Sequence, residues 1–426
     1  MKRVVKKMMM LSVALLLAGC DLLDPFNNNN NDSGKGRIVT PVVFTVAEEA
    51  VSEESYDFAF RFLEAVDSTM PDGTNYIVSP FSAQVALAMA MNGAADSTYL
   101  EVRDVLGYNG MDIDDINSYN KKLIDGLDCV AEDIRVDIAN SLWVNNNIFL
   151  NSFTEVLPEY KFSMLENYDA EVQALDFSNP STLNHINRWC SSHTNSLIEK
   201  AFDFINPYSV AILLNAVYFK APWNEPFEKK YNTMGFFDSD SKGSQEVVYM
   251  NHNFDAKYYK NDKFEITAKA YGKSARYAFY IVLPRKGATT DECFEELSTD
   301  LWENRSFELV EVDMSIPKFK IENRTSLIPA LKSMGISRAF TADADFSNLA
   351  TGDSIHITDV SQSNIFMIDE KGAEGASATK VEIGYDSAPL PLKKVDFKVN
   401  RPFLFIVMEN STKTVLFAGK VSSIEL

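Results

Sequence analysis

The stretch that decides the fold runs from Glu370 to Ser387 and reads Glu-Lys-Gly-Ala-Glu-Gly-Ala-Ser-Ala-Thr-Lys-Val-Glu-Ile-Gly-Tyr-Asp-Ser. It contains no Leu, Phe or Trp, so it cannot bury a core of its own and we expect it to be exposed. From Ala373 onward the stretch alternates with a period of two. Small or apolar residues occupy one set, Ala373, Gly375, Ser377, Thr379, Val381, Ile383 and Tyr385, and the charges of Glu374, Lys380 and Glu382 fall on the other. This alternation is typical of a half-buried strand.

A segment that is too polar to stay buried as a loop, yet has the pattern of a strand, indicates two resting states. The alternative is a linker rich in Gly and Ala that leads into the next strand. The neighbouring segments bear on this choice. Residues Val360–Asp369 upstream have the composition of a strand, and the segment Val395–Val407 lies downstream.

Together these three segments resemble the reactive-centre loop of a serpin and its flanks. The hinge signature Glu-x-Gly-x-Glu is present at Glu370, Gly372 and Glu374, and the signature Asn-Arg-Pro-Phe-Leu-Phe follows at residues 400–405. The resemblance extends in the right order from about Ser55 to Leu426. It implies an α+β fold in which helices surround three β-sheets and an exposed reactive-centre loop lies near the C-terminus.

Other segments carry the same resemblance, and the most specific is Asn215-Ala216-Val217-Tyr218-Phe219-Lys220 leading to Trp223. Ser79-Pro80-Phe81-Ser82 before an apolar helix, Ile186–Trp189, Ile316–Phe319 and Leu331–Ile336 also match. The hydrophobic patterns along this region predict both strands and helices. The strands are Ile138–Val144, Ala170–Phe177, Val210–Lys220, Ala278–Pro284 and Glu311–Ile321, and the helices include Tyr56–Val66 and Phe153–Leu165.

The N-terminus has the pattern of a targeting signal. Lys2, Arg3, Lys6 and Lys7 precede an apolar run, Met8–Leu17, that is too short to span a bilayer. The segment Leu17-Ala18-Gly19-Cys20 resembles a bacterial lipobox, which implies a signal peptide at 1–19 and a lipid on Cys20. The alternative is an ordinary secretory signal in which the cysteine is accidental. With lipidation, we expect the protein in the bacterial cell envelope, anchored to the outer membrane or exposed at the surface.

A polar, low-complexity segment follows the signal, with five Asn residues at 27–31 and then Asp32-Ser33-Gly34. We interpret residues 20–44 as a tether and residues 45–426 as a single serpin domain. If Cys20 carries lipid, Cys129, Cys190 and Cys293 remain. This odd number without CxxC spacing argues against a disulfide framework or a metal site and favours buried free thiols.

Charge and histidine content exclude several functions. The 426 residues carry a net charge of −20, and loss of the four positive charges of the signal would give −24. We therefore expect no binding to nucleic acid, no membrane contact except through the lipid, and no heparin-like activator site. The four histidines, His185, His193, His252 and His356, form no HExxH or other chelating pattern. We expect no catalytic residue, no metal and no cofactor.

The resemblance to serpins also implies roles for particular residues. The hinge comprises Glu370, Gly372, Ala373, Glu374, Gly375, Ala376, Ser377, Ala378 and Thr379. The breach, where loop insertion begins, comprises Trp223 and Lys318, and Lys318 is expected to pair with Glu370. The shutter beneath the central sheet comprises Ser79, Ser82, Asn215 and Gln362. The family has His where this chain has Gln362, so we expect the shutter to keep its hydrogen bonds and lose its sensitivity to pH. Gly375 stands where Ala is usual and is expected to slow insertion.

The function implied is suicide inhibition of serine proteases, with cysteine proteases as a second class. The protease forms an acyl-enzyme on the loop, and the cleaved loop then enters the central sheet as a new strand. The alternative is a non-inhibitory surface lipoprotein with a serpin fold that acts as a binding module. Its usual sign is a charged or bulky hinge residue, and Ala373 is neither. In either case we expect a monomer.

The scissile bond in the family lies about sixteen residues after the hinge Glu. Counting from Glu370 to 386 gives the bond Asp386–Ser387, which suits a protease whose specificity pocket carries Arg or Lys. Tyr385, one residue earlier, would suit a chymotrypsin-like pocket and remains the alternative. The pair Lys393-Lys394 lies too far along the loop.

Overall fold

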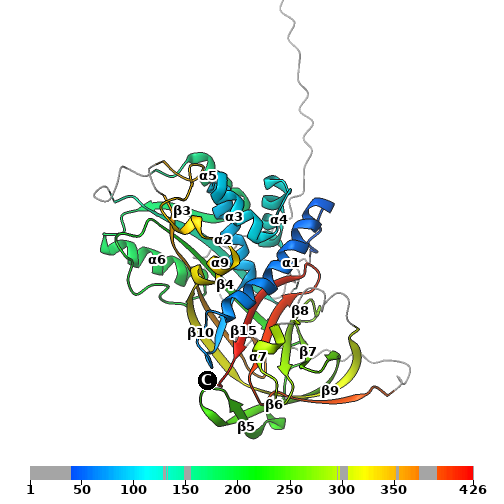
Figure 1. Cartoon of the computed structure of the whole chain (residues 1–426). Coiled ribbons are helices and arrows are strands. Elements are labelled where there is room, and N and C mark those ends of the chain that lie inside the picture. Colours follow the sequence, from blue (N-terminus) through cyan, green and yellow to red (C-terminus); the bar gives the residue numbers. More distant parts are fainter. Residues whose placement is uncertain are drawn as a thin grey trace, which may run out of the picture.

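A computed structural model describes residues 40–127, 131, 133–147, 155–294, 296–297, 306–351, 355–373 and 391–425. These residues form the expected α+β fold, in which helices surround β-sheets (Figure 1). Most of the helices lie in the upper part of that view, and the longest strands curve through its lower part.

The smaller sheet contains six strands: β2 (Arg135–Asn145), β3 (Ala170–Leu175), β4 (Ala211–Pro222), β10 (Phe319–Ser326), β11 (Ile357–Ile368) and β12 (Gly372–Ala373). Their order is β10-β11-β12-β4-β2-β3. Strands β4 and β11 are parallel neighbours at one end of the sheet, and the short β12 separates them at the other end. We call the line between β4 and β11 the seam.

The larger sheet contains nine strands: β1 (Tyr76–Val78), β5 (Thr233–Ser239), β6 (Gly243–Lys260), β7 (Phe264–Tyr271), β8 (Tyr277–Pro284), β9 (Glu308–Pro317), β13 (Lys394–Lys398), β14 (Phe403–Glu409) and β15 (Thr414–Val421). The backbone path runs β1-β15-β14-β8-β7-β6-β9-β13, and β5 pairs with β6. The described strands thus form two hydrogen-bonded sheets where the sequence led us to expect three. The reason is β6, whose 18 residues pair with β5, β7 and β9 and so join two groups of strands.

The helices are α1 (Val46–Asp67), α2 (Pro80–Gly93), α3 (Asp96–Leu106), α4 (Ile113–Gly126), α5 (Pro158–Tyr168), α6 (Pro180–His193), α7 (Thr290–Phe294) and α9 (Ile328–Met334). Helix α1 begins ten residues before the predicted Tyr56, because Thr45 and Glu48 form a capping box at its start. Helix α2 begins after Ser79, whose side chain accepts a hydrogen bond from the amide of Ser82.

Two predicted elements have different bounds in the structure. The helix predicted from Phe153 begins at Pro158 as α5, with Pro at a helix start, and residues 151–154 lie outside the described chain. The single strand predicted from Glu311 to Ile321 is divided at Lys318. There the chain leaves the nine-stranded sheet after Pro317, which lacks an amide donor, and enters the six-stranded sheet at Phe319.

The core has two parts on opposite faces of the six-stranded sheet. The main cluster joins residues of both sheets with residues of α1, α2, α3 and α4, and on the six-stranded sheet it includes Leu213, Val217, Phe219 and Phe366. The second cluster lies under α6 and includes Trp143, Trp189, Ile212 and Leu214. Successive residues of β4 therefore point alternately into the two clusters, as the period of a strand requires.

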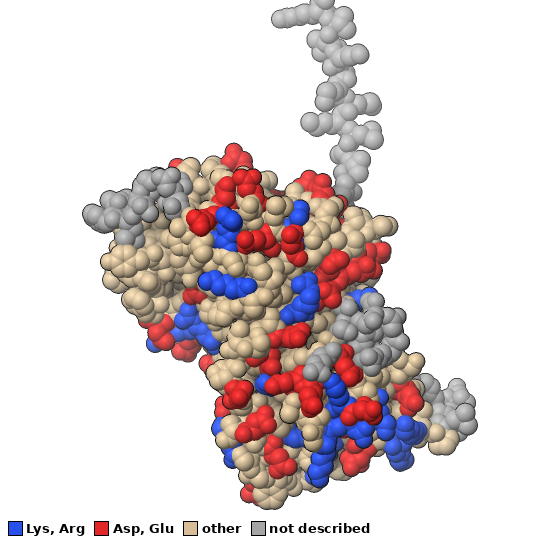
Figure 2. Space-filling model, in the orientation of Figure 1, with Lys and Arg blue, Asp and Glu red and all other residues tan. Residues whose placement is uncertain are grey.

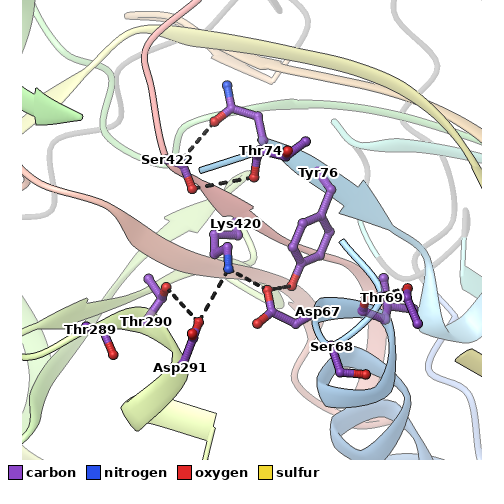
Figure 3. Close-up of polar contacts among 12 residues, drawn as sticks. Asp67, Ser68, Thr69, Thr74, Tyr76, Thr289, Thr290, Asp291, Lys420 and Ser422 are labelled. Carbon is purple, nitrogen blue, oxygen red and sulfur yellow. Dashed lines mark hydrogen bonds and ion pairs between the residues drawn. The ribbon is translucent and has the colours of Figure 1, made fainter. Parts of the chain in front are cut away.

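A buried lysine ties the C-terminal end of α1 to the nine-stranded sheet (Figure 3). Lys420 of β15 places its Nζ 2.8 Å from Oδ1 of Asp67 and 3.5 Å from Oδ1 of Asp291 at α7. The Tyr76 hydroxyl of β1 donates to Asp67 Oδ1 at 2.9 Å. Four elements far apart in the sequence are thus fixed at one point.

Within the described residues, no helix is both long and apolar enough to cross a bilayer. Cys190 and Cys293 are buried free thiols, as the sequence predicted, and burial raises the pKa of each thiol to about 12. Cys129 lies outside the described residues.

Candidate functional site: the seam of the six-stranded sheet

The hinge begins as a strand lodged in the seam. Ala373 of β12 pairs with Ile368 of β11 on one side and with Ala221 of β4 on the other, both antiparallel. Its side chain belongs to the main core and is 1% exposed. The chain that leads into residues 374–390 therefore already occupies the first position of a central strand.

Aromatic residues that follow β4 hold the backbone of the hinge. The amide of Trp223 donates to the carbonyl of Lys371 at 2.8 Å, and the Trp223 indole Nε1 donates to the carbonyl of Asp369 at 2.8 Å. The amide of Phe227 donates to the carbonyl of Glu370 at 2.9 Å. The Trp223 ring stacks on Tyr271 of β7 with a centroid separation of 4.3 Å, which fixes its orientation.

The pair expected between Lys318 and Glu370 is present. Lys318 Nζ lies 2.5 Å from Glu370 Oε1, which also accepts a hydrogen bond from the Asn232 amide at 2.7 Å. Glu370 is 3% exposed. Burial alone would raise the pKa of this carboxyl group, but the hydrogen bonds from Lys318 and Asn232 outweigh it and keep the pKa below its usual value. Trp223, Lys318 and Glu370 thus meet at one place, which we call the breach.

A tight turn connects β11 to β12. Asp369 Oδ1 accepts hydrogen bonds from the amides of Lys371 at 2.7 Å and Gly372 at 3.2 Å. Gly372 has φ +151°, and a Cβ atom there would collide with the carbonyl oxygen of Ala221. Only glycine fits this approach of the hinge to β4.

At the other end of the seam, Gln362 of β11 is bonded to the start of α2. Its Oε1 accepts from the amide of Ser79 at 2.9 Å, and its Nε2 donates to the carbonyl of Ser79 at 2.8 Å. Gln362 also lies in register with Asn215 of β4. The structure therefore brings Ser79, Asn215 and Gln362 together, and Ser82 joins them through a hydrogen bond from its hydroxyl to Asn215 Oδ1. We call these four residues the shutter.

Two further amides, Asn140 and Asn364, extend the shutter and were not predicted from the sequence. Asn140 of β2 accepts a hydrogen bond from Asn215 Nδ2 and donates to the carbonyl of Tyr168 at 2.8 Å. Asn364 of β11 donates to the carbonyl of Ile77 at 3.2 Å. Asn140 lies within a predicted apolar strand, as Asn215 does, so the same signal identifies it. Asn364 is two residues beyond Gln362, which puts both side chains on one face of the strand.

The remaining residues assigned from the sequence fall outside the described chain. They are the hinge residues Glu374, Gly375, Ala376, Ser377, Ala378 and Thr379, the reactive-bond residues Tyr385, Asp386 and Ser387, and Cys20. The described chain resumes at Pro391, just before β13, which pairs with β9 in the nine-stranded sheet.

The histidines lie in separate parts of the fold. His185 and His193 are both in α6, His252 is in β6, and His356 precedes β11. Among the residues whose positions are described, no group of three or more His, Cys, Asp or Glu side chains is arranged to hold a metal ion.

Acidic side chains are spread over the face shown in Figure 2, in keeping with the net charge of −20. Lys and Arg gather in the lower part of that view, beside carboxylates. Two ion pairs join β13 or its start to the region of β9: Lys393 with Glu308 at 3.1 Å, and Lys394 with Glu311 at 3.0 Å. The strands bring these charges together from distant segments, so a linear scan for charged clusters does not find them.

Comparisons with known proteins agree in pointing to one family. The family model described as Serpin (serine protease inhibitor) matches residues 53–424. Iripin-5 of Ixodes ricinus is 29% identical over 394 residues, which cover 89% of this chain and 96% of that protein. The crystal structure of Tengpin, a thermophilic serpin in its native state, has a TM-score of 0.79 and 30% identity and covers 91% of this chain and 97% of its own. Human thyroxine-binding globulin in complex with thyroxine has a TM-score of 0.79 and 25% identity, with coverage of 89% and 100%.

Proposed function

The chain belongs to the serpin family of protease inhibitors, and from this premise we propose that it is a single-use inhibitor that traps its protease by inserting the cleaved loop into the seam. The protease attacks the loop and forms an acyl-enzyme. The freed loop then enters the six-stranded sheet, carries the protease with it and distorts the protease active site before deacylation. The target class proposed is serine proteases, with cysteine proteases second.

The observation that carries this proposal is the position of β12. Gly372 lies opposite Pro222 and Ala373 opposite Ala221, with β11 on the far side of Ala373. If the same antiparallel register continues, Glu374 falls opposite Lys220 and Ile383 falls opposite Ala211, where β4 begins. The hinge thus needs no new register to become a full central strand.

The faces of β4 fit the alternation of the loop sequence. Residues directly opposite each other on neighbouring strands share a face. Ala211, Leu213, Val217, Phe219 and Ala221 belong to the main core. In the continued register they lie opposite the small or apolar set, and the charged set would face the side of α6. Burying Val381 and Ile383 would contribute ~1.5–3 kcal/mol each.

Insertion has to open the closed half of the seam. Strands β4 and β11 pair directly from Ala211 with Ile357 to Asn215 with Gln362. In the continued register Thr379 would enter between Asn215 and Gln362, so its hydroxyl would meet the amides of the shutter. Residues up to Ala378 would fill the part of the seam where β4 and β11 are not paired with each other.

The decisive experiment is incubation with serine proteases of different specificity, followed by denaturing electrophoresis. An SDS-stable complex at the summed mass supports the proposal. Cleavage of the loop without a complex, for every protease that cleaves it, overturns it. Heat-denatured protein, which presents the same loop sequence without the seam, is the control for adventitious acylation.

The scissile bond proposed is Asp386–Ser387, with Tyr385–Asp386 as the alternative. Mass spectrometry of the C-terminal fragment released from the complex distinguishes them. A fragment that begins at Ser387 supports the first bond, and one that begins at Asp386 supports the second. A fragment that begins after Lys393 or Lys394 contradicts both.

A second candidate function is a binding module without inhibitory activity. The observation that favours it is a cavity of about 590 Å³ lined by residues of β6, β7, β8 and β14. The lining includes Phe254, Ala268, Tyr280 and Met408. One similar structure, that of human thyroxine-binding globulin, is a complex with a small molecule. This candidate predicts cleavage without complex formation, and binding of an apolar ligand that survives loop cleavage.

We also propose that the protein is a monomer anchored to the bacterial envelope through a lipid on Cys20. The support is the segment Leu17–Cys20 and the polar tether that follows it. Incorporation of labelled fatty acid in cells producing the full chain, and its loss in Cys20→Ser, is the expected result. Labelling that persists in Cys20→Ser contradicts the anchor. The oligomeric state is tested by analytical ultracentrifugation of residues 45–426, and a mass larger than that of one chain contradicts the monomer.

A further inference from the structure

A lysine is buried behind the breach in a cage of aromatic rings. Lys269 lies in β7 and is 2% exposed. Its Nζ is 4.1 Å from the ring centroid of Phe254, 4.7 Å from that of Phe227 and 5.9 Å from that of Trp223. Rings at these distances attract the charged form of the amine. A lysine in such a place is uncommon, because burial of its charge is costly unless the charge is paired.

A polar chain leads from this amine toward the surface. Lys269 Nζ lies 3.0 Å from His252 Nδ1, and His252 Nε2 lies 3.7 Å from Glu225 Oε2. Glu225 is largely exposed, whereas His252 is mostly buried. The imidazole stacks on Phe254 at 5.3 Å and meets Phe227 edge-on at 5.8 Å. Amine, imidazole and carboxylate are thus held in sequence by the same rings that form the cage.

Two walls of the cage are the residues that hold the hinge. Trp223 donates to the carbonyls of Lys371 and Asp369, and Phe227 donates to that of Glu370. A movement of Trp223 or Phe227 that lets water reach Lys269 therefore also loosens these bonds. The environment of the amine and the closure of the breach are coupled through shared residues.

We propose that Lys269 is a positioning residue for loop insertion, which acts through Trp223 and Phe227 to make opening of the breach easier as the pH falls toward neutrality. This inference rests on the proposed insertion mechanism and adds a regulator to it.

The direction follows from linkage. Burial lowers the pKa of Lys269 to about 7, against an opposing contribution from Glu225. A lysine in contact with water has a pKa near 10.4. Between these values the open breach binds a proton that the closed breach does not, so lowering the pH favours opening by up to about tenfold per unit. Below pH 7 both states are protonated and the effect levels off.

Other charged groups also lie around the cage. Glu370, paired with Lys318, lies on the hinge side and stays charged across this range because its pKa lies below its usual value. The remaining charged and titratable side chains that line the adjoining cavity are Glu225, Asp255, Lys257, Lys413, Tyr56 and Tyr280. His252 is in direct contact with Lys269 and belongs to the same polar group.

The first test measures opening of the seam without a protease. A synthetic peptide with the sequence of residues 373–384 is incubated with the uncleaved protein, and its incorporation rate is followed by native electrophoresis at pH 7 and pH 9. With pKa values of about 7 in the closed state and about 10.4 in the open state, we expect incorporation to be about fiftyfold faster at pH 7. In Lys269→Met the rate should be equal at the two pH values, and in Lys269→Arg, which stays charged, it should be fast at both. The exposed Lys398→Met should keep the dependence of the parent.

The second test separates this inference from the proposed function. Because the folded state has the lower pKa, the melting temperature of the uncleaved parent should rise between pH 7 and pH 9 by at least about 3 °C more than that of Lys269→Met. If the parent and Lys269→Met incorporate the peptide with the same pH dependence, the role of Lys269 is overturned, even if their melting temperatures differ.

The proposed function can fail separately. If the parent forms no SDS-stable complex with any protease but still incorporates the peptide faster at lower pH, the inhibitor function is overturned and the role of Lys269 stands.

Discussion

The two ends of the seam between β4 and β11 are held together differently. At the end near Ala373, the hinge lies between the strands, beside an ion pair and a cage of aromatic rings. At the end near Asn215, β4 and β11 pair directly and are held by amides and hydroxyls. The breach contains Lys318 and Glu370 and lies against Lys269, all of which carry or can carry charge. The shutter contains Ser79, Ser82, Asn215 and Gln362, none of which titrates in the physiological range.

This difference separates two requirements of an insertion mechanism. In the proposed mechanism, the end that would open first is held by interactions that water and protons can weaken. The end that would open last is held by neutral hydrogen bonds, to which Thr379 would bring a hydroxyl in the continued register. Substitutions that change the charged breach alone or the neutral shutter alone test whether the two ends have these separate roles.

Cleavage of the loop should abolish the difference, because a complete new strand would fill both ends of the seam. We expect limited proteolysis between Ile383 and Ala388 to raise the melting temperature by at least about 10 °C, since several kcal/mol of apolar burial are added. Differential scanning calorimetry before and after cleavage measures this. An unchanged or lower melting temperature would place the protein in the non-inhibitory class.

Ala373→Arg should block the open end. Ala373 is already buried in the main core of the uncleaved protein, so an arginine there would displace the start of the hinge from the seam, and insertion would then have to bury its charge. We expect the stoichiometry of inhibition, the number of inhibitor molecules used per protease inhibited, to rise at least tenfold. This factor corresponds to a change of about 1.4 kcal/mol in the free-energy difference that decides between trapped complex and cleaved product. Titration of a protease with each variant measures it. Ala47→Arg adds the same charge at an exposed position of α1 and should inhibit as the parent does.

Glu370→Gln should weaken the breach alone. It removes the charge partner of Lys318 and keeps an oxygen for Asn232, so we expect a loss of about 1–3 kcal/mol in the free energy of unfolding at pH 7. The pKa of Glu370 is lower in the folded state, so its contribution is present above the ordinary value of 4.5 and is lost as the pH falls below it. Urea unfolding from pH 7 to pH 3 should therefore show less acid destabilisation in the variant.

The control for Glu370→Gln is Glu322→Gln. It removes an exposed partner of Lys320 on β10 and should change the unfolding free energy by less than about 1 kcal/mol. Equal effects of the two substitutions would mean that the breach pair has no special weight.

Gln362→His should give the neutral end a titratable group. Gln362 is 2% exposed, and burial disfavours a charged imidazole, so the folded-state pKa should lie below about 6.5. Stability is then lost as the pH falls below that value, by about 1 kcal/mol between pH 7.5 and pH 5.5. Urea unfolding at the two pH values measures the change, and the loss in Gln362→His should exceed that in the parent and in Gln362→Leu by about 1 kcal/mol. Equal losses in all three proteins would contradict this prediction.

The breach pair and most of the shutter could be predicted because their residues lie in short signatures that fix their places in the fold. Glu370 belongs to the hinge signature, and Lys318 follows Ile316-Pro317, so their meeting follows once the family is identified. Asn215 stands out as an amide in an apolar run. In each case one segment of sequence contains enough information to assign the residue.

Lys269 could not be predicted in this way. In the alternating strand Phe264–Tyr271 a lysine looks like a residue of the solvent-facing set. Its burial depends on rings from β6 and from the segment after β4, which are distant in the sequence and meet only in the folded chain. The joining of the strands into one nine-stranded sheet was missed for a similar reason, since it depends on how far β6 continues past its first partners.

Lys318 is the single residue between the end of β9 and the start of β10. Its ion pair with Glu370 therefore holds the hinge at the point where the chain crosses from one sheet to the other. The pair therefore links the hinge mechanically to both sheets, because the backbone continues from Lys318 into β9 on one side and into β10 on the other. In the proposed insertion mechanism, a force that pulls on the loop would reach both sheets through this one residue until the ion pair breaks. After that the hinge would be free of the crossing, while the backbone between the sheets stays continuous.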